Sequence, residues 1–261
     1  MNTKAIVAIL LLTLMPAAGA RAEGKFDSYL FQNAGKILSD PPGFLYEFQR
    51  NMEHTSPLPP GRRAMINWHF LSGFLIVPLP DIATTAINGT LKVRLHPEGR
   101  RIPGFPQVDF TYGAWTSLLA GIVEEEPDPS DPDETTITDF SVHGHYLATT
   151  FATSVEPKVR LFWGYKYSSL TFDMRLSQEE EVMGQFVDSL KNGMREHTIS
   201  AGIELATNVN KQWVLQWDYG IVNKVISARV MWQHKIYDFG FNFYPEAVFF
   251  LQPQMNIHVY F

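Results

Sequence analysis

A short run of polar side chains carries the most concentrated chemistry in the sequence. Asp139, Ser141, His143 and His145 occupy alternate positions, so in an extended strand all four would point to one side. Two histidines beside a carboxylate can chelate a metal, although this ligand set is incomplete without a neighbouring strand. Asp139, Ser141 and His143 also have the residue types of a hydrolase triad. The segment therefore offers metal binding and acyl hydrolysis as alternatives to a structural role.

A third chemistry needs carboxylates from other segments. Asp139 together with Asp218 or Asp238 and a histidine could perform acid proteolysis, provided that the fold brings these groups together. The sequence contains no phosphate-binding glycine loop and no cofactor motif, so we expect neither a bound cofactor nor a dedicated metal site. The competing interpretation is that the whole polar group belongs to a structural hydrogen-bond network.

The segments that must position these side chains alternate between apolar and polar residues. In Gln212 to Ile221, for example, Trp213, Leu215 and Trp217 alternate with polar neighbours. Such a period of two is typical of a strand with two different faces. The pattern recurs from about Met65 to the end of the chain in about ten segments, with eight or twelve as alternatives; bacterial barrels require an even number.

The N-terminal residues have the pattern of a cleaved secretory signal. Lys4 precedes a short apolar run from Ala5 to Met15, and Ala20 to Ala22 form a small-x-small cleavage site. No other stretch has the roughly 18 apolar residues of a membrane-spanning helix, so a membrane form must be a closed barrel. We expect a signal peptide over 1–22, a helical segment and proline-rich linker over 23–62, and a barrel over 63–261.

The last strand gives the most specific signal. Its outward positions are Met255, Ile257, Val259 and the terminal Phe261, and they alternate with polar residues. An alternating final strand that ends in phenylalanine resembles the C-terminal signature of bacterial outer-membrane β-barrel proteins. The resemblance covers this strand and, as architecture, most of the mature chain, without identifying a subfamily. It implies an antiparallel up-and-down transmembrane barrel in the cell outer membrane of a Gram-negative bacterium, and recognition of the last strand by the barrel-assembly machinery.

Two helical regions are expected beside the strands. Phe26 to Met52 shows helical spacing, and it could pack on the periplasmic end, lie on the membrane surface, or enter the lumen as a plug. In the long connection after the fifth strand, Ser177 and Glu180 form a capping box ahead of a helix expected to reach Asn192. That connection and the acidic loop Glu124 to Thr135 are expected on the outer side, where barrel loops are long.

The inward positions of the strands predict a polar lumen. Opposite charges in a narrow interior should pair, because an unpaired buried charge is costly. A barrel of this size is nearly filled by its own side chains, so we expect a plugged lumen rather than a wide pore. The expected luminal network consists of Lys92, Arg94, Asp109, Asp139, His143, His145, Arg160, Lys166, Glu204, Asp218, Arg229 and Asp238.

The sequence favours a non-enzymatic role. We expect an integral outer-membrane barrel that acts as a narrow, porin-like channel or as a structural or interaction module. The alternatives are an outer-membrane lipid hydrolase or protease that uses Asp139, Ser141 and His143, and an exported soluble ligand-binding barrel. The net charge of -6 without a basic tract argues against a nucleic-acid partner. The resemblance to outer-membrane barrels implies outer-membrane lipid and the barrel-assembly machinery as partners.

Overall fold

The computed structural model describes residues 46, 49–74, 77–80, 85–100, 102–117, 137–182, 185–208, 210–245 and 251–261. The expected signal peptide lies outside these residues. Residues 46 and 49–52 are helical, and among the described residues no helix combines the length and the apolar composition needed to cross a bilayer. Strands make up most of the rest: β1 (Ala64–Phe74), β2 (Val77–Pro80), β3 (Thr85–His96), β4 (Gln107–Ser117), β5 (Ile137–Glu156), β6 (Val159–Val182), β7 (Gln185–Asn208), β8 (Lys211–Gly220), β9 (Ile226–Gln233), β10 (Tyr237–Phe243) and β11 (Leu251–Tyr260).

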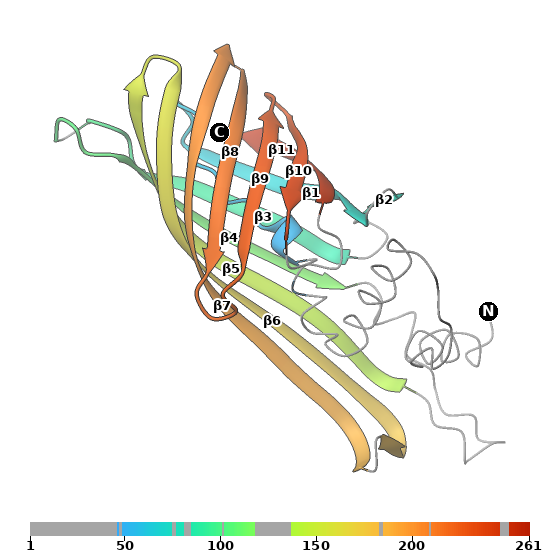
Figure 1. Ribbon diagram of the computed structural model, residues 1–261. Coiled ribbons are helices and arrows are strands. Elements are labelled where there is room, and N and C mark those ends of the chain that lie inside the picture. Colours follow the sequence, from blue (N-terminus) through green and yellow to red (C-terminus); the bar gives the residue numbers. More distant parts are fainter. Residues whose placement is uncertain are drawn as a thin grey trace, which may run out of the picture.

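The strands form one closed antiparallel sheet (Figure 1). From β3 to β11 each strand pairs with the next in sequence, and β11 returns to β1 with Met65 opposite Tyr260. On its other edge, β1 pairs with β3 over Ala64 to Asn67 and with β2 over Leu71 to Phe74. Because β2 and β3 together fill one position, the barrel has ten strand positions, which confirms the predicted architecture and its preferred strand count.

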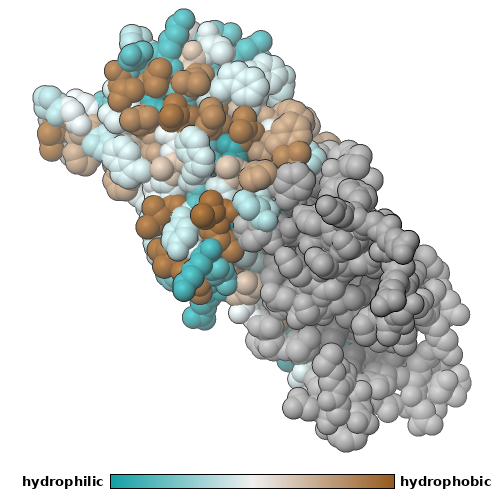
Figure 2. All heavy atoms as spheres, viewed as in Figure 1, coloured by the Kyte–Doolittle hydropathy of each residue, from teal (hydrophilic) through white to brown (hydrophobic). Residues whose placement is uncertain are grey.

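The two faces of the sheet have opposite polarity. On β8, Trp213 and Trp217 are 44% and 47% exposed on the outside, whereas Gln212 and Gln216 are buried inside. Large apolar side chains are exposed in the same way on most strands, and Figure 2 shows them gathered in the barrel wall on the face in view. An apolar exterior around a polar interior is the inverse of a water-soluble barrel, and it identifies the fold as a transmembrane β-barrel.

The two ends of the barrel differ in their connections. Residues 157–158 join β5 to β6, and residues 209–210 join β7 to β8, at the end where Ala64 hydrogen-bonds to Phe261. We call this the turn end. At the opposite end, which we call the loop end, β4 ends at Ser117 and β5 begins at Ile137. Short turns face the periplasm in outer-membrane barrels, and long loops face the exterior.

The predicted helix between Ser177 and Asn192 is wrong. Strand β6 continues to Val182 and β7 begins at Gln185, with Glu180 opposite Val187 and Met174 opposite Leu190. A capping box is a local preference worth about 1 kcal/mol. Antiparallel pairing of β6 with β7, which resumes at Glu180 after an irregularity that follows Arg175, provides backbone hydrogen bonds to both strands and outweighs it. Figure 1 shows β6 and β7 running on past the ends of the neighbouring strands.

Candidate functional site

The chain that precedes β1 passes through the lumen. Tyr46 packs near the loop end, in a buried cluster with Trp115 and Phe172. Leu58 lies near the turn end, where its carbonyl oxygen accepts hydrogen bonds from Gln107 and Arg160 at 2.9 and 3.3 Å. We call Tyr46 together with residues 49–58 the plug. The plug therefore descends from the loop end to the turn end, and the chain reverses there to enter β1.

At the loop end, the plug packs closely against the wall. Trp115 Nε1 donates a hydrogen bond to Gln49 Oε1 at 3.3 Å, and Gln49 in turn donates to Glu53. Gly144 lies directly beneath this contact, since a Cβ there would come within 2.1 Å of Gln49 Oε1 and 2.3 Å of Trp115 Nε1. The absence of a side chain at Gly144 is thus what allows the plug helix to approach β5.

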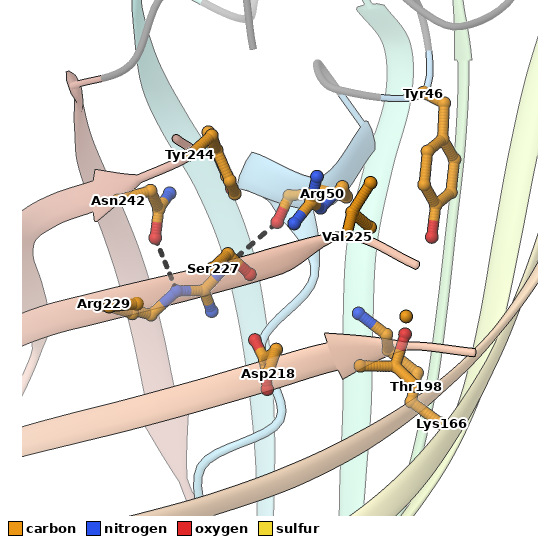
Figure 3. A pocket seen from close by; sticks show the side chains of 12 residues that line it. Tyr46, Arg50, Lys166, Thr198, Asp218, Val225, Ser227, Arg229, Asn242 and Tyr244 are labelled. Atoms are coloured by element: carbon orange, nitrogen blue, oxygen red, sulfur yellow. Dashed lines mark hydrogen bonds between the residues drawn. The ribbon is translucent and has the colours of Figure 1, made fainter. Parts of the chain in front are cut away.

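Arg229 binds the C-terminal carbonyl groups of the plug helix (Figure 3). Its guanidinium donates to the carbonyl oxygens of Arg50 at 2.9 Å and Glu53 at 2.5 Å, while Asn242 Oδ1 accepts its Nε hydrogen at 2.6 Å. The Glu53 carboxylate forms an ion pair with Lys166. The last carbonyls of a helix lack partners within the helix, so these two basic side chains hold the helix to the wall.

In the middle of the plug, His54 connects two charged wall residues. Lys92 Nζ lies 3.1 Å from His54 Nδ1, and His54 Nε2 lies 2.9 Å from Asp238 Oδ2. Since the lysine ammonium can only donate, Nδ1 accepts and the proton sits on Nε2, which donates to Asp238. The backbone NH of His54 also donates to the hydroxyl of Tyr146 at 2.8 Å. The wall therefore fixes both the position and the tautomer of this imidazole.

At the turn end, ion pairs surround Leu58. Its backbone NH donates to Asp109 at 2.6 Å, and Asp109 pairs with Arg94 at 3.3 Å. Arg160 pairs with Glu204 at 2.8 Å. The plug thus takes its hydrogen bonds mainly from charged and amide side chains of the wall, along the whole length of the lumen.

Most of the residues predicted for the luminal network do point inward. Asp218 is partly buried and accepts a hydrogen bond from Gln216. The others are buried or nearly so, and they contact the plug or one another: Lys92, Arg94, Asp109, Arg160, Lys166, Glu204, Arg229 and Asp238.

The assignment of faces on β5 is wrong. Val142, Tyr146 and Ala148 are buried inside, whereas the polar residues between them point outward. The outward positions include all members of the proposed catalytic or chelating group, Asp139, Ser141, His143 and His145. The plug explains the reversal, because Val142 packs with Tyr46 and Tyr146 bonds the plug backbone. An inner wall that contacts a packed segment does not need to be polar.

The outward group is not assembled into a site with the luminal carboxylates. Asp139 forms a long ion pair with Arg175 at 3.9 Å, and both side chains are more than half exposed. Asp218 and Asp238 lie on the inner side of the wall, separated from Asp139 by the sheet itself. The acid-protease arrangement therefore does not form, and Asp139 does not belong to the luminal network.

The orientation of β5 can be tested by mutation. Ser141→Ala, at a half-buried outward position, and His143→Ala, at an exposed one, should each change the free energy of unfolding by less than about 0.5 kcal/mol. Tyr146→Phe should cost about 1 kcal/mol, because its hydroxyl accepts from the plug and bonds Thr90 at 2.7 Å. Urea unfolding in detergent, followed by tryptophan fluorescence, measures all three. Greater losses at the outward positions than at Tyr146 would contradict the observed faces.

The sequence reasoning missed the plug residues that make the contacts. Asn51 bonds Gln252 and accepts from Asn242, and Thr55 bonds Thr150 and Gln216. A signal was present, since residues 49 to 56 are almost all polar although they directly precede the first strand. A polar run of this kind is compatible with a polar lumen and is a poor match for a membrane surface.

A small pocket opens beside the plug helix, among strands β6 to β10 (Figure 3). Its free volume is about 330 Å³ including the open mouth. Arg50 lies with its guanidinium 4.4 Å from the ring centroid of Tyr244, and Asp218 lines the opposite side.

Comparison with known proteins assigns the chain to no family. No family model matches the chain, and no curated protein matches it. Two structures of Ail, the attachment invasion locus protein of Yersinia pestis, are similar at 11% and 10% identity, with TM-scores of 0.33 and 0.31. The second is a complex with the heparin analogue sucrose octasulfate. The alignments cover 76% of this chain and 99% and 97% of the Ail chains. The class of this chain, a transmembrane β-barrel, therefore rests on its own closed sheet and on the polarity of its two faces.

Proposed function

We propose that the protein is an integral outer-membrane barrel that acts as a narrow channel, closed by its own plug. The observation that carries the proposal is the path of the plug, which runs from one end of the lumen to the other through polar contacts. Arg229, Lys166 and Arg160 lie on the wall and Glu53 and His54 on the plug, so the contact surface below the apolar cluster of Tyr46 is hydrophilic on both sides. A wall of this kind stays compatible with water after the plug leaves.

The experiment is single-channel recording in planar bilayers. Replacing residues 49–56 by glycine and serine at the same length removes the side chains of the plug and keeps the connection to β1. We expect the unchanged protein to be closed for most of the time and the replaced form to show steady conductance. Lys158→Ser, in the exposed turn between β5 and β6, serves as the control and should behave like the parent. The channel proposal would be overturned if the protein with the replaced plug folds but does not conduct ions.

A role as an interaction module has a different observation in its favour. Strands β6 and β7 contain 24 residues each, whereas a tilted barrel strand needs about 9–11 to cross the membrane. The ribbon of these two strands therefore projects well beyond the bilayer at the loop end. If the barrel with the replaced plug does not conduct, the ribbon of β6 and β7 becomes the better candidate for the functional part of the protein, as an interaction surface. A shortened form in which β6 ends at residue 174 and β7 begins at residue 191 should then show altered self-association in detergent while its barrel stays folded.

The cellular placement is part of the same proposal. Met255, Ile257, Val259 and Phe261 lie on the outer face of the last strand, where outer-membrane lipid and the barrel-assembly machinery would contact them. The pairing of β11 with both β10 and β1 makes this strand one side of the closing seam. Recognition of the strand before closure would bring the assembly machinery to that seam.

A further inference from the structure

A second pocket lies at the turn end, where four separate pieces of chain meet. It has a free volume of about 310 Å³ including its open mouth. Arg62 comes from the linker before β1, Lys211 from the start of β8, His234 and Lys235 from the β9–β10 turn, and Tyr260 from the end of β11. None of the described side chains that line this pocket carries a carboxylate. Positive groups thus gather here from distant parts of the sequence.

The basic side chains are held in place without being neutralised. The Arg62 guanidinium lies 5.3 Å from the centroid of the Tyr260 ring, and Lys211 Nζ lies 5.6 Å from that of Trp232. Cation–π contacts of this kind orient a cation and leave its charge available. Within the described part of the chain, neither side chain forms an ion pair with a carboxylate, and the same holds for the exposed Lys235.

Two further observations point to a ligand. His234 Nδ1 is buried and has no hydrogen-bond partner among the described residues, so a bound acceptor could satisfy it. The carboxylate that bonds the lining residue Gln212 is already engaged. Glu204, which accepts from Gln212 at 2.9 Å, pairs with Arg160.

Glu98, on the β3–β4 connection, accepts hydrogen bonds from Ser154 and Thr153. Its partial burial raises the pKa, but these hydrogen bonds outweigh burial and the pKa of Glu98 lies below its ordinary value. Glu98 is therefore a satisfied carboxylate and does not depend on the pocket cations.

We infer that this pocket binds an oxyanion of the phosphate class. Arginine supplies a planar fork for two oxygens, and lysine supplies a point charge, which together suit a tetrahedral phosphate. Two sources present that group at this end of the barrel. One is a phospholipid headgroup, which Lys211 can reach because the Trp232 that it contacts pairs with the lipid-facing Trp213 and Phe239. The other is inorganic phosphate or a soluble phosphate ester.

The test uses the full folded chain and two matched double variants. Arg62→Gln with Lys211→Gln removes two charges from the pocket. Arg100→Gln with Lys158→Gln removes two exposed charges from the same end, outside it. Inorganic phosphate is titrated into each form by calorimetry in non-ionic detergent. In a second arm, thermal stability is compared in nanodiscs of phosphatidylglycerol and of phosphatidylcholine.

We expect the pocket variant to bind phosphate about tenfold or more weakly than the parent, and the control variant to stay within about twofold. If the pocket variant differs from the control variant only in its thermal stability in phosphatidylglycerol nanodiscs, the ligand is a lipid headgroup. If the two variants differ in their affinity for free phosphate, the ligand is soluble. The inference is overturned if both variants lose phosphate affinity equally, or if the pocket variant differs from the control variant neither in phosphate binding nor in thermal stability in nanodiscs. If the double variant fails to fold, the exposed Lys235→Gln replaces it. Conductance is not used, so the outcome is independent of the channel proposal.

Discussion

Arg229→Ala should release the loop end of the plug and open the barrel to ions without unfolding it. The substitution leaves the carbonyl oxygens of Arg50 and Glu53 and the Asn242 amide oxygen buried without their donor. Unsatisfied buried acceptors cost about 1–3 kcal/mol each, so a loss of about 3 kcal/mol in plug docking is expected. That loss shifts the ratio of docked to released plug by about 100-fold.

Planar-bilayer recording of open probability measures this shift. Arg229→Lys should give an intermediate result, because a lysine keeps the charge and loses the fork that reaches two carbonyls. Arg195→Ala, at an exposed position outside the lumen, is the matched control and should record like the parent. An Arg229→Ala form that is folded and as closed as the parent would show that the helix carbonyls are not the attachment point of the plug.

Gly240→Ala should prevent most of the barrel from closing. A Cβ at this inward position of β10 would lie 2.1 Å from the carbonyl oxygen of Val230 and 2.8 Å from the Cα of Met231. Both are backbone atoms of β9, the strand that pairs with β10, so no side-chain movement can relieve the overlap. The two strands must separate locally, and the hydrogen bonds lost there lie in a lipid environment where water cannot replace them.

Gel mobility before and after boiling in detergent measures the fraction of closed barrel. We expect the Gly240→Ala form to migrate mostly as unfolded chain without heating. Gly89→Ala on β3 is the control, since a Cβ there meets nothing within 4 Å, and it should keep the heat-dependent shift. Equal folded fractions in the two variants would mean that β9 and β10 tolerate a wider spacing.

The sequence was sufficient for the barrel because lipid and lumen impose a strict period of two. The outward Trp213 and Trp217 of β8 and the inward Arg160 and Lys166 of β6 followed from alternation alone. Alternation failed on β5, where Val142 and Tyr146 face the plug and Ser141 and His143 face outward. Hydropathy assigns faces correctly only when one side meets lipid and the other meets water or polar groups. The plug adds a third environment that no single strand reveals.

The remaining errors have the same origin in long-range contacts. The capping pattern at Ser177 and Glu180 is a local preference, and the strand that replaces the helix depends on pairing between β6 and β7. The luminal position of residues 49–58 follows from their contacts with nearly every strand, from Gln107 on β4 to Gln252 on β11. Helical spacing near Phe48 could indicate an amphipathic surface helix equally well, so the plug was one of several expectations.

The continuity of the plug with β1 has a consequence for the order of assembly. The plug descends to the turn end and the chain then reverses into β1, whose partner across the seam is β11, the most C-terminal of the described strands. Met65 and Tyr260 come from opposite ends of the barrel sequence, and their pairing carries the largest loop-closure entropy of any neighbouring pair. If the sheet curls around the plug and then closes at this seam, the plug does not have to be threaded through an already closed barrel. On this route the plug lies inside the curling sheet before the seam closes, and its contacts with Lys166 and Asp238 can form before β1 and β11 pair.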